Sequence, residues 1–142
     1  MRPRDLLRFV RRCIEVAVNR GHDKVSSDDI RKAEESYSED MLKETQFELR
    51  DVYTRHVDPL YEFLGCSVNL SKAEALGLVK NDEKLLELLL WFGVLGVQEP
   101  RQAEPRFGYE VRYNVAKLMA PAMQDKGFFV VHPAFRRALE CR

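Results

Sequence analysis

The chain has 142 residues, of which 45% are hydrophobic and 32% are charged. These values are ordinary for a globular protein, and the length allows one domain or two small ones. The formal net charge is zero, which excludes a chain-wide positive field that would draw the protein to nucleic acid.

Neither the start of the chain nor its longest apolar run suggests a membrane protein. The arginine-rich start lacks an apolar core with a cleavage site, so it does not predict a signal peptide. Residues 85–97 form the longest apolar run, which contains Glu87 and is too short to span a bilayer. Cys13, Cys66 and Cys141 are odd in number and far apart, and therefore predict no disulfide framework and no metal site. A reducing cytoplasm fits these features best.

Two helices are predicted in the first third of the chain. Pro3 suits the first turn of a helix over residues 3–20, since its missing N–H has no partner there in any case. Apolar residues recur at helical spacing through this segment, and Gly21 is a natural end to it. Ser26 or Ser27 is a good N-cap for the second helix.

Charge is unevenly distributed over these helices. Residues 1–33 hold nine basic and five acidic residues, whereas residues 34–52 hold two basic and seven acidic ones. We interpret both groups as solvated helix faces. The acidic segment is predicted to continue the second helix with a bend near residues 36–38, or else to begin a new helix capped by Ser38.

The rest of the chain alternates short helices and strands. Three helices are predicted, over residues 57–64, 72–78 and 83–92. Three strands are predicted, over residues 94–98, 109–113 and 127–131. A polar loop connects the first two strands over residues 99–108, and residues 114–123 fit either a helix or a strand. The helix over residues 72–78 is predicted to be capped by Asn69 or Ser71, and the helix over residues 83–92 by Asn81 or Asp82. Pro133 begins a last helix, over residues 134–140.

Three helices followed by a hairpin predict a mainly α fold class with a small antiparallel sheet. This order resembles the winged-helix modules that close the C-termini of many bacterial P-loop ATPases, including STAND-type and defence-associated ones. The segments that carry the resemblance are residues 88–97, 109–114 and 129–139. We predict a lid-like segment with a linking helix over residues 1–54 and a winged-helix-like α+β domain over residues 55–142.

Residues 2–37 resemble the small helical lid that follows the nucleotide-binding core of AAA+-type P-loop ATPases. The resemblance implies that an arginine at the helix start senses the terminal phosphates of the nucleotide. By position Arg4 fits this role best, Arg2 next, and Arg8 lies one turn further on. The family pattern often has Gly or Asn where Arg2 stands. Alternatively, Arg4 and Arg8 pair with nearby carboxylates or with a neighbouring helix.

The guanidinium group suits phosphate sensing, because it is always charged and its planar fork matches two phosphate oxygens. A helix N-terminus adds partial positive charge. The lid would then belong to a larger ATP-driven protein. Met1 stands almost directly before the first helix, which favours an excised fragment with an added Met.

No motif in the sequence predicts catalysis by this chain. A phosphate-binding loop, paired magnesium acids, a nucleophile elbow and zinc motifs are all absent from the sequence. His22, His56 and His132 lie in separate segments and do not predict a metal site. We therefore expect no enzyme, no metal and no cofactor in this chain, with ATP and magnesium only in the parent protein. His132 is expected to fix a strand-to-helix corner.

DNA binding is possible on this pattern but not favoured. The helix that would enter the major groove begins over residues 81–87 with three acids and one lysine. Its apolar residues surround it, which is typical of a buried helix. The candidate nucleic-acid contacts are Arg101, Arg106, Arg112, Arg136 and Arg137. The last two are also explained as solvation of the final helix.

The function predicted from the sequence is a non-catalytic C-terminal regulatory or interaction region of a P-loop ATPase. It would couple nucleotide state to another domain, another protomer or a protein partner in the cytoplasm, without a membrane. The alternatives are a winged-helix DNA-binding regulator and an oligomerisation module, which would expose a large apolar patch.

Overall fold

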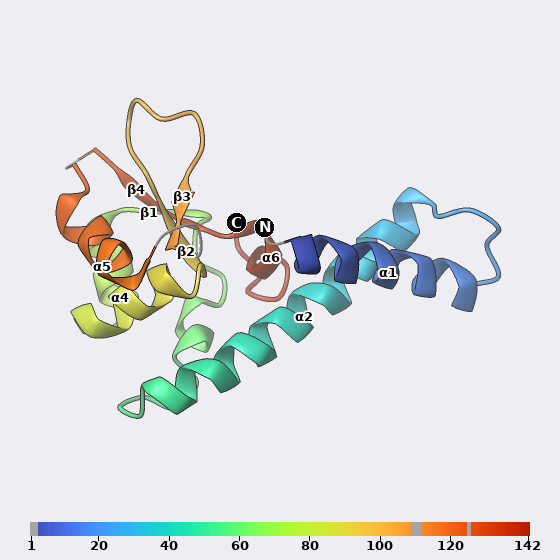
Figure 1. Ribbon diagram of the computed structural model, residues 1–142, viewed down its shortest axis with the longest axis horizontal. Helices are drawn as coiled ribbons and strands as arrows, with labels where there is room; N and C mark the ends of the chain where they lie inside the picture. Colours follow the sequence, from blue (N-terminus) through green and yellow to red (C-terminus); the bar gives the residue numbers. More distant parts are fainter. Residues whose placement is uncertain (1–2, 109–111, 125) are drawn as a thin grey trace.

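The computed structural model describes residues 3–108, 112–124 and 126–142, and its side chains from Asp5 onward within these ranges. Within these ranges the chain is mainly helical with a small four-stranded antiparallel sheet, which confirms the predicted fold class. Figure 1 shows a long helical hairpin on one side and the sheet with its short helices on the other. No helix of the described residues is long and apolar enough to cross a membrane.

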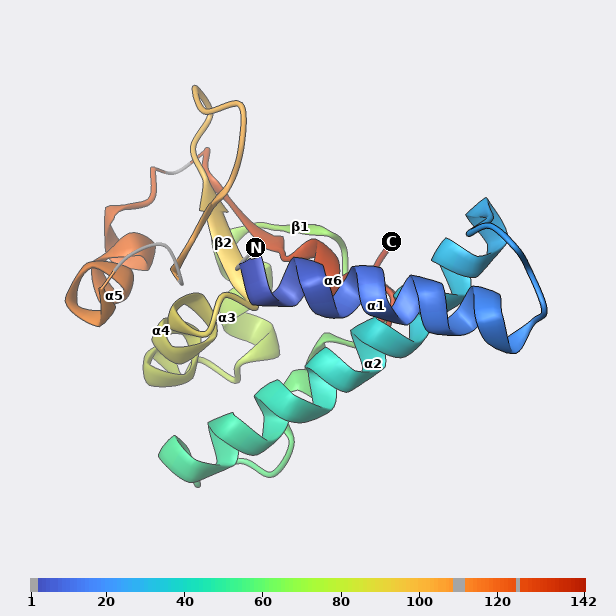
Figure 2. The ribbon, with the colours of Figure 1, turned by 45° about the vertical axis from the view of Figure 1, so that its right-hand side comes forward.

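The hairpin consists of α1 (Pro3–Asn19) and α2 (Ser27–Val52). Gly21 between them has a φ of 72°, a left-handed conformation that favours glycine. Ser26 caps α2 through a reciprocal capping box with Asp29. Figures 1 and 2 agree that α1 lies beside the N-terminal half of α2.

The second helix is continuous through Ser38, so the alternative of a new helix beginning there is wrong. The Ser38 side chain is buried and does not cap a helix. Its Oγ instead accepts a hydrogen bond of 2.9 Å from the backbone N–H of Ala138, at the far end of the sequence. A tertiary contact therefore explains the serine that resembled a local cap.

The sheet has the order β1-β4-β2-β3, and all its pairs are antiparallel. Its strands are β1 (Asn69–Leu70), β2 (Leu95–Gln98), β3 (Arg106–Phe107) and β4 (Phe128–Val131). The short helices around it are η1 (Pro59–Phe63), α3 (Lys72–Leu78), α4 (Glu83–Trp91), α5 (Tyr113–Ala122) and α6 (Pro133–Arg136). Ser71 and Asp82 cap α3 and α4, each being one of the two predicted alternatives.

The strand predicted over residues 109–113 is corrected in part. Residues 109–111 lie outside the described residues, and Tyr113 begins α5. The next strand along the chain that pairs with β2 is β3, which lies within the predicted loop. A Cβ on Gly108 would lie 1.9 Å from the backbone oxygen of Leu90, so the chain here runs against the end of α4. The ambiguous stretch after it forms the helix α5.

Two helices are shorter than predicted. Asp58 has a left-handed φ of 56°, so the helix predicted over residues 57–64 is only the 3-10 helix η1. The last helix ends at Arg136, and turns follow it. Beyond this helix the chain forms hydrogen bonds with the segment after η1, where Leu139 O accepts from Gly65 N at 2.8 Å.

The core lies between α4, the sheet and the C-terminal half of α2. All five leucines of α4 are buried, which confirms that this helix is packed inside: Leu85, Leu86, Leu88, Leu89 and Leu90. Leu49 of α2 and Phe129 of β4 belong to the same core and are fully buried. A helix that is apolar on every side is stable only when it is covered in this way.

Helix α2 joins the hairpin to the sheet through several polar contacts. Gln46 Oε1 accepts from the backbone N–H of Leu60 at 3.2 Å. At the end of α2 the buried Tyr53 hydroxyl donates to Asp82 Oδ2 at 2.6 Å, which ties α2 to the cap of α4. Burial, together with this bond, raises the pKa of Tyr53 to about 12.

His132 fixes the corner between β4 and α6, as predicted. Its Nδ1 accepts a hydrogen bond of 3.1 Å from the backbone N–H of Ala134, and its ring meets Phe107 edge to face at 4.6 Å. The side chain is buried, and burial lowers its pKa from 6.5 to about 4. The neutral ring is therefore the form that caps α6.

We predict that folding stability decreases as the pH falls from 6.5 to about 4. In this window unfolded His132 binds a proton and folded His132 does not, so the loss amounts to about 3 kcal/mol. His132→Asn keeps a good N-cap without titrating, and urea unfolding across the window should show a weaker pH dependence than the parent protein. His56→Asn, at a partly exposed histidine, is the matched control. Equal pH dependence in His132→Asn and the parent protein would contradict this role.

Candidate interaction surface on helix α1

Helix α1 has more apolar surface than α2 covers. Cys13 and Ala17 are buried in the hairpin. On the adjoining face, apolar residues three or four positions apart remain between 45% and 70% exposed: Leu7, Val10, Ile14 and Val18. We call these four side chains the outer stripe. Isolated exposed apolar residues are common, whereas a row along one helix face is typical of an interaction site.

The opposite flank of α1 is fixed by ion pairs to α2. Arg8 makes a bidentate pair with Glu44, with N–O distances of 2.9 and 2.5 Å, and Arg12 Nη2 lies 2.5 Å from Asp40. Basic residues of the first helix thus pair with acidic residues of the second across the hairpin, and these charged residues do not only solvate the helix faces. Exposed pairs of this kind add little stability each, so their main effect is on how α1 lies along α2.

The turn of the hairpin is organised around the buried carboxylate of Asp29. This carboxylate accepts hydrogen bonds from the Ser26 backbone N–H at 2.9 Å and from Arg20 at 2.6 Å, and His22 Nδ1 lies 2.8 Å away. The Ser26 hydroxyl also donates to it at 2.6 Å. The hydrogen bonds from Ser26 and His22 hold the pKa of Asp29 well below its usual value. The charged form of Asp29 therefore closes the turn.

Of the three arginines predicted to sense nucleotide, Arg8 is the one whose side chain the structure describes. Arg8 is held by Glu44 on the neighbouring helix, which is the alternative that the sequence left open. Arg4 lies in the first turn of α1, and its side chain lies outside the described part of the structure. Arg2 also lies outside the described residues. Arg8 could reach a phosphate only by leaving its carboxylate.

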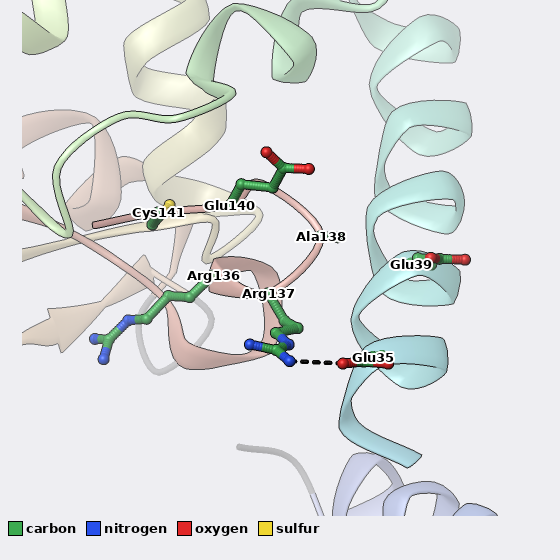
Figure 3. Close-up of a pocket in the computed structure, with 7 residues that line it drawn as sticks. All are labelled: Glu35, Glu39, Arg136, Arg137, Ala138, Glu140 and Cys141. Carbon is green, nitrogen blue, oxygen red and sulfur yellow. Dashed lines mark hydrogen bonds and ion pairs between the residues drawn. The ribbon is translucent and has the colours of Figure 1, made fainter. Parts of the chain in front are cut away.

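The five predicted nucleic-acid contacts do not gather on one element. Arg101 is exposed between β2 and β3, Arg106 is on β3, and Arg112 directly precedes α5. Arg136 Nε donates to the backbone oxygen of Val131 at 2.8 Å. Arg137 pairs with Glu35 of α2 at 2.6 Å (Figure 3). Arg136 at the end of α6 and Arg137 directly after it thus bind within the fold.

A cleft of about 450 Å³ lies between α2 and the C-terminal tail, as Figure 3 shows. Its lining consists of Glu35, Glu39, Arg136, Arg137, Ala138, Glu140 and Cys141. Three carboxylates and two guanidinium groups share this lining, and one ion pair between them is already formed. This mixture selects neither an anion nor a cation. Among the described residues, no three His, Cys, Asp or Glu side chains gather as a metal site.

Sequence reasoning missed two features of these surfaces. The residues of the outer stripe are among the apolar residues that recur at helical spacing in the first helix, but this pattern did not indicate which of them α2 would cover. The second feature is a contact between Cys66 and Cys141, whose Sγ atoms lie 3.6 Å apart. Because the two cysteines lie 75 residues apart, their spacing in the sequence does not predict this contact.

Residues 1–46 match a family described as the FunZ-associated C-terminal helical domain. The matched segment contains α1 and most of α2, and with them the outer stripe. Searches of curated proteins and of solved structures found no match. The family match is consistent with a C-terminal helical domain of a larger protein.

We predict that Asp29→Ala loosens the hairpin turn, because Arg20, His22 and the Ser26 N–H lose a shared acceptor. Amide hydrogen exchange around residues 20–30 should become faster, and the melting temperature should fall. Asp28→Ala is the matched control, since Asp28 is 46% exposed and pairs with Arg20 and Arg31 at the surface. If the two variants exchange at the same rate, the buried carboxylate does not organise the turn.

Proposed function

We propose that this chain is an interaction region of a larger protein, and that the outer stripe docks on the nucleotide-binding domain of that protein. The observation that carries the proposal is the exposed apolar row on α1, a helix whose other side is already fixed to α2. Burying one such side chain completely stabilises a complex by about 1.5–3 kcal/mol. The four side chains are already partly buried and association costs free energy, so the stripe supplies part of the docking energy and not all of it.

The rigidity of α1 favours docking. The helix is held by the Asp29 carboxylate at one end and by the Arg8–Glu44 pair toward the other. Little conformational entropy is then lost when a partner covers the stripe, because the backbone of α1 is already ordered. The hairpin presents a preformed surface.

Two lines support a nucleotide-binding domain as the partner. The family description names a C-terminal helical domain, and its match contains the stripe. The resemblance of residues 2–37 to an AAA+ lid supplies the partner's chemistry, because such a lid packs on a P-loop core. In this proposal ATP and magnesium bind the core, Arg4 senses the nucleotide, and this chain has no catalytic role. We place the protein in the cytoplasm.

The sheet part supports a winged-helix relationship, with one departure. Helices α3 and α4 precede β2, and β4 pairs between β1 and β2, as in a helix pair followed by a hairpin. The departure is α5, which interrupts the chain between β3 and β4. We propose that this part binds protein and not DNA. The leucines of its helix α4 are buried, and the acidic Asp82 that caps this helix and Glu83 that begins it would repel phosphates.

We predict that Leu7→Gln combined with Ile14→Gln leaves this chain folded when it is expressed alone, because both side chains are exposed. In the full-length protein the same pair should speed amide exchange in α1, since the docked partner is lost. Val57→Gln with Leu118→Gln, both exposed and outside the hairpin, is the control. Unchanged α1 exchange contradicts docking. A dimer of the chain alone that the α1 pair abolishes would favour oligomerisation instead.

We predict that Arg4→Ala in the full-length protein weakens ATP binding roughly 10-fold or more, because a charge-assisted hydrogen bond to phosphate is lost. Arg11→Ala is the matched control, since Arg11 lies on the same helix, is 82% exposed and pairs with Glu15. ATP affinity and turnover measured for both variants check this. Values for Arg4→Ala equal to those of the parent protein would remove the sensor role and leave the docking proposal untouched.

A further inference from the structure

The C-terminal tail brings Cys141 beside Cys66, 75 residues away in the sequence, with 3.6 Å between their Sγ atoms. The backbone holds the two segments together. Arg142 N donates to Cys66 O at 3.0 Å, and Val68 N donates to Arg142 O at 2.9 Å. The contact is therefore supported by backbone pairing next to the thiols and not only by side-chain rotamers.

We propose that Cys66 and Cys141 are a redox-active pair that a hydroperoxide converts into a reversible disulfide. Both cysteines are free thiols and partly exposed. Bond formation requires the sulfurs to approach from 3.6 Å to about 2.05 Å. The paired backbone already keeps the two segments adjacent, so the sulfurs need to close only this gap.

The surroundings distinguish the roles of the two thiols. Cys141 is one of the residues that line the cleft of Figure 3, and Arg136 belongs to the same lining. The hydrogen bond with Cys66 lowers the pKa of Cys141, and Arg136 adds to this effect. The same bond, with burial, raises the pKa of Cys66. We assign Cys141 as the nucleophile, because it shares the cleft lining with the cation Arg136, and Cys66 as the resolving thiol.

The reaction balances in two steps. The Cys141 thiolate attacks one peroxide oxygen, the O–O bond breaks, and the products are Cys141 sulfenic acid and an alkoxide, or hydroxide from hydrogen peroxide, which takes a proton. Cys66 sulfur then attacks the Cys141 sulfur, the S–O bond breaks, and the hydroxide leaves as water with the Cys66 proton. The two thiols lose two electrons in total, and the peroxide gains them.

The disulfide would stabilise the contact between the tail and α2. The tail carries Arg137, paired with Glu35, and Ala138, bonded to Ser38. A bond at Cys141 anchors the end of this tail beside the segment after η1. In a reducing compartment the pair rests as a dithiol and is oxidised only under peroxide stress. This site is independent of the docking surface on α1.

The test treats the reduced protein with hydrogen peroxide and follows thiols, mass and peptide map. We expect free thiols to fall from three to one, a loss of two hydrogens, a Cys66–Cys141 cross-linked peptide, and full reversal by dithiothreitol. The melting temperature should rise by about 10 °C on oxidation. Cys13→Ser should behave like the parent protein, since Cys13 is buried in the hairpin and burial raises its pKa.

Two further variants separate the roles. Cys66→Ser should stop at a Cys141 sulfenic acid that dimedone traps, and Cys141→Ser should react at least about 10-fold more slowly. Circular dichroism checks that each variant is folded. A peptide map that links Cys13, disulfides only between molecules, or oxidation no faster than that of Cys13 in the parent protein would overturn the proposal.

Discussion

Neighbouring faces of α2 are buried against two different parts of the chain, and the rest of the structure depends on this arrangement. Tyr37 meets Phe9 of α1 with ring centroids 5.4 Å apart, whereas the next residue, Ser38, bonds to Ala138 of the tail. Further along, Leu49 enters the core of the sheet part. Successive residues of a helix point about 100° apart, so one helix serves both partners. The hairpin and the sheet are therefore expected to form one cooperative unit.

This arrangement also explains why the apolar stripe of α1 stays outside. Helix α1 is bound through Cys13 and Ala17, and rotating it to bury the stripe would expose them and break the Arg8–Glu44 pair. Other residues of α2 contact α6, η1 and the core. The fold thus supports α1 from one side and leaves its outer stripe to a partner.

Local signals in the sequence predicted much of the fold. Helix caps such as Ser71 and Asp82 lie within one turn of what they cap, so they are readable without tertiary structure. The features that could not be predicted depend on distant contacts. The chain leaves the sheet at Gly108 because it packs against Leu90, and Ser38 resembled a cap although it bonds to Ala138. The Cys66–Cys141 contact depends on the path of the tail.

The candidate surface was predictable only in part, for the same reason. The sequence predicted apolar residues at helical spacing in the first helix and an excess of basic residues over residues 1–33. Only the structure shows that Glu44 takes Arg8 and that Leu7 and Ile14 stay uncovered. The sequence resemblance drew attention to arginines at the start of this helix, whereas the described side chains draw attention to its apolar row.

The most direct test of this account compares two probes during urea unfolding. Trp91, the one tryptophan of the chain, packs against Tyr113 of α5 and reports on the sheet part through its fluorescence. Far-UV circular dichroism reports mainly on α1 and α2, whose 17 and 26 residues make them the longest helices described. One cooperative unit predicts coincident transitions with the same midpoint. Loss of helix signal at lower urea than the change in Trp91 fluorescence would contradict it.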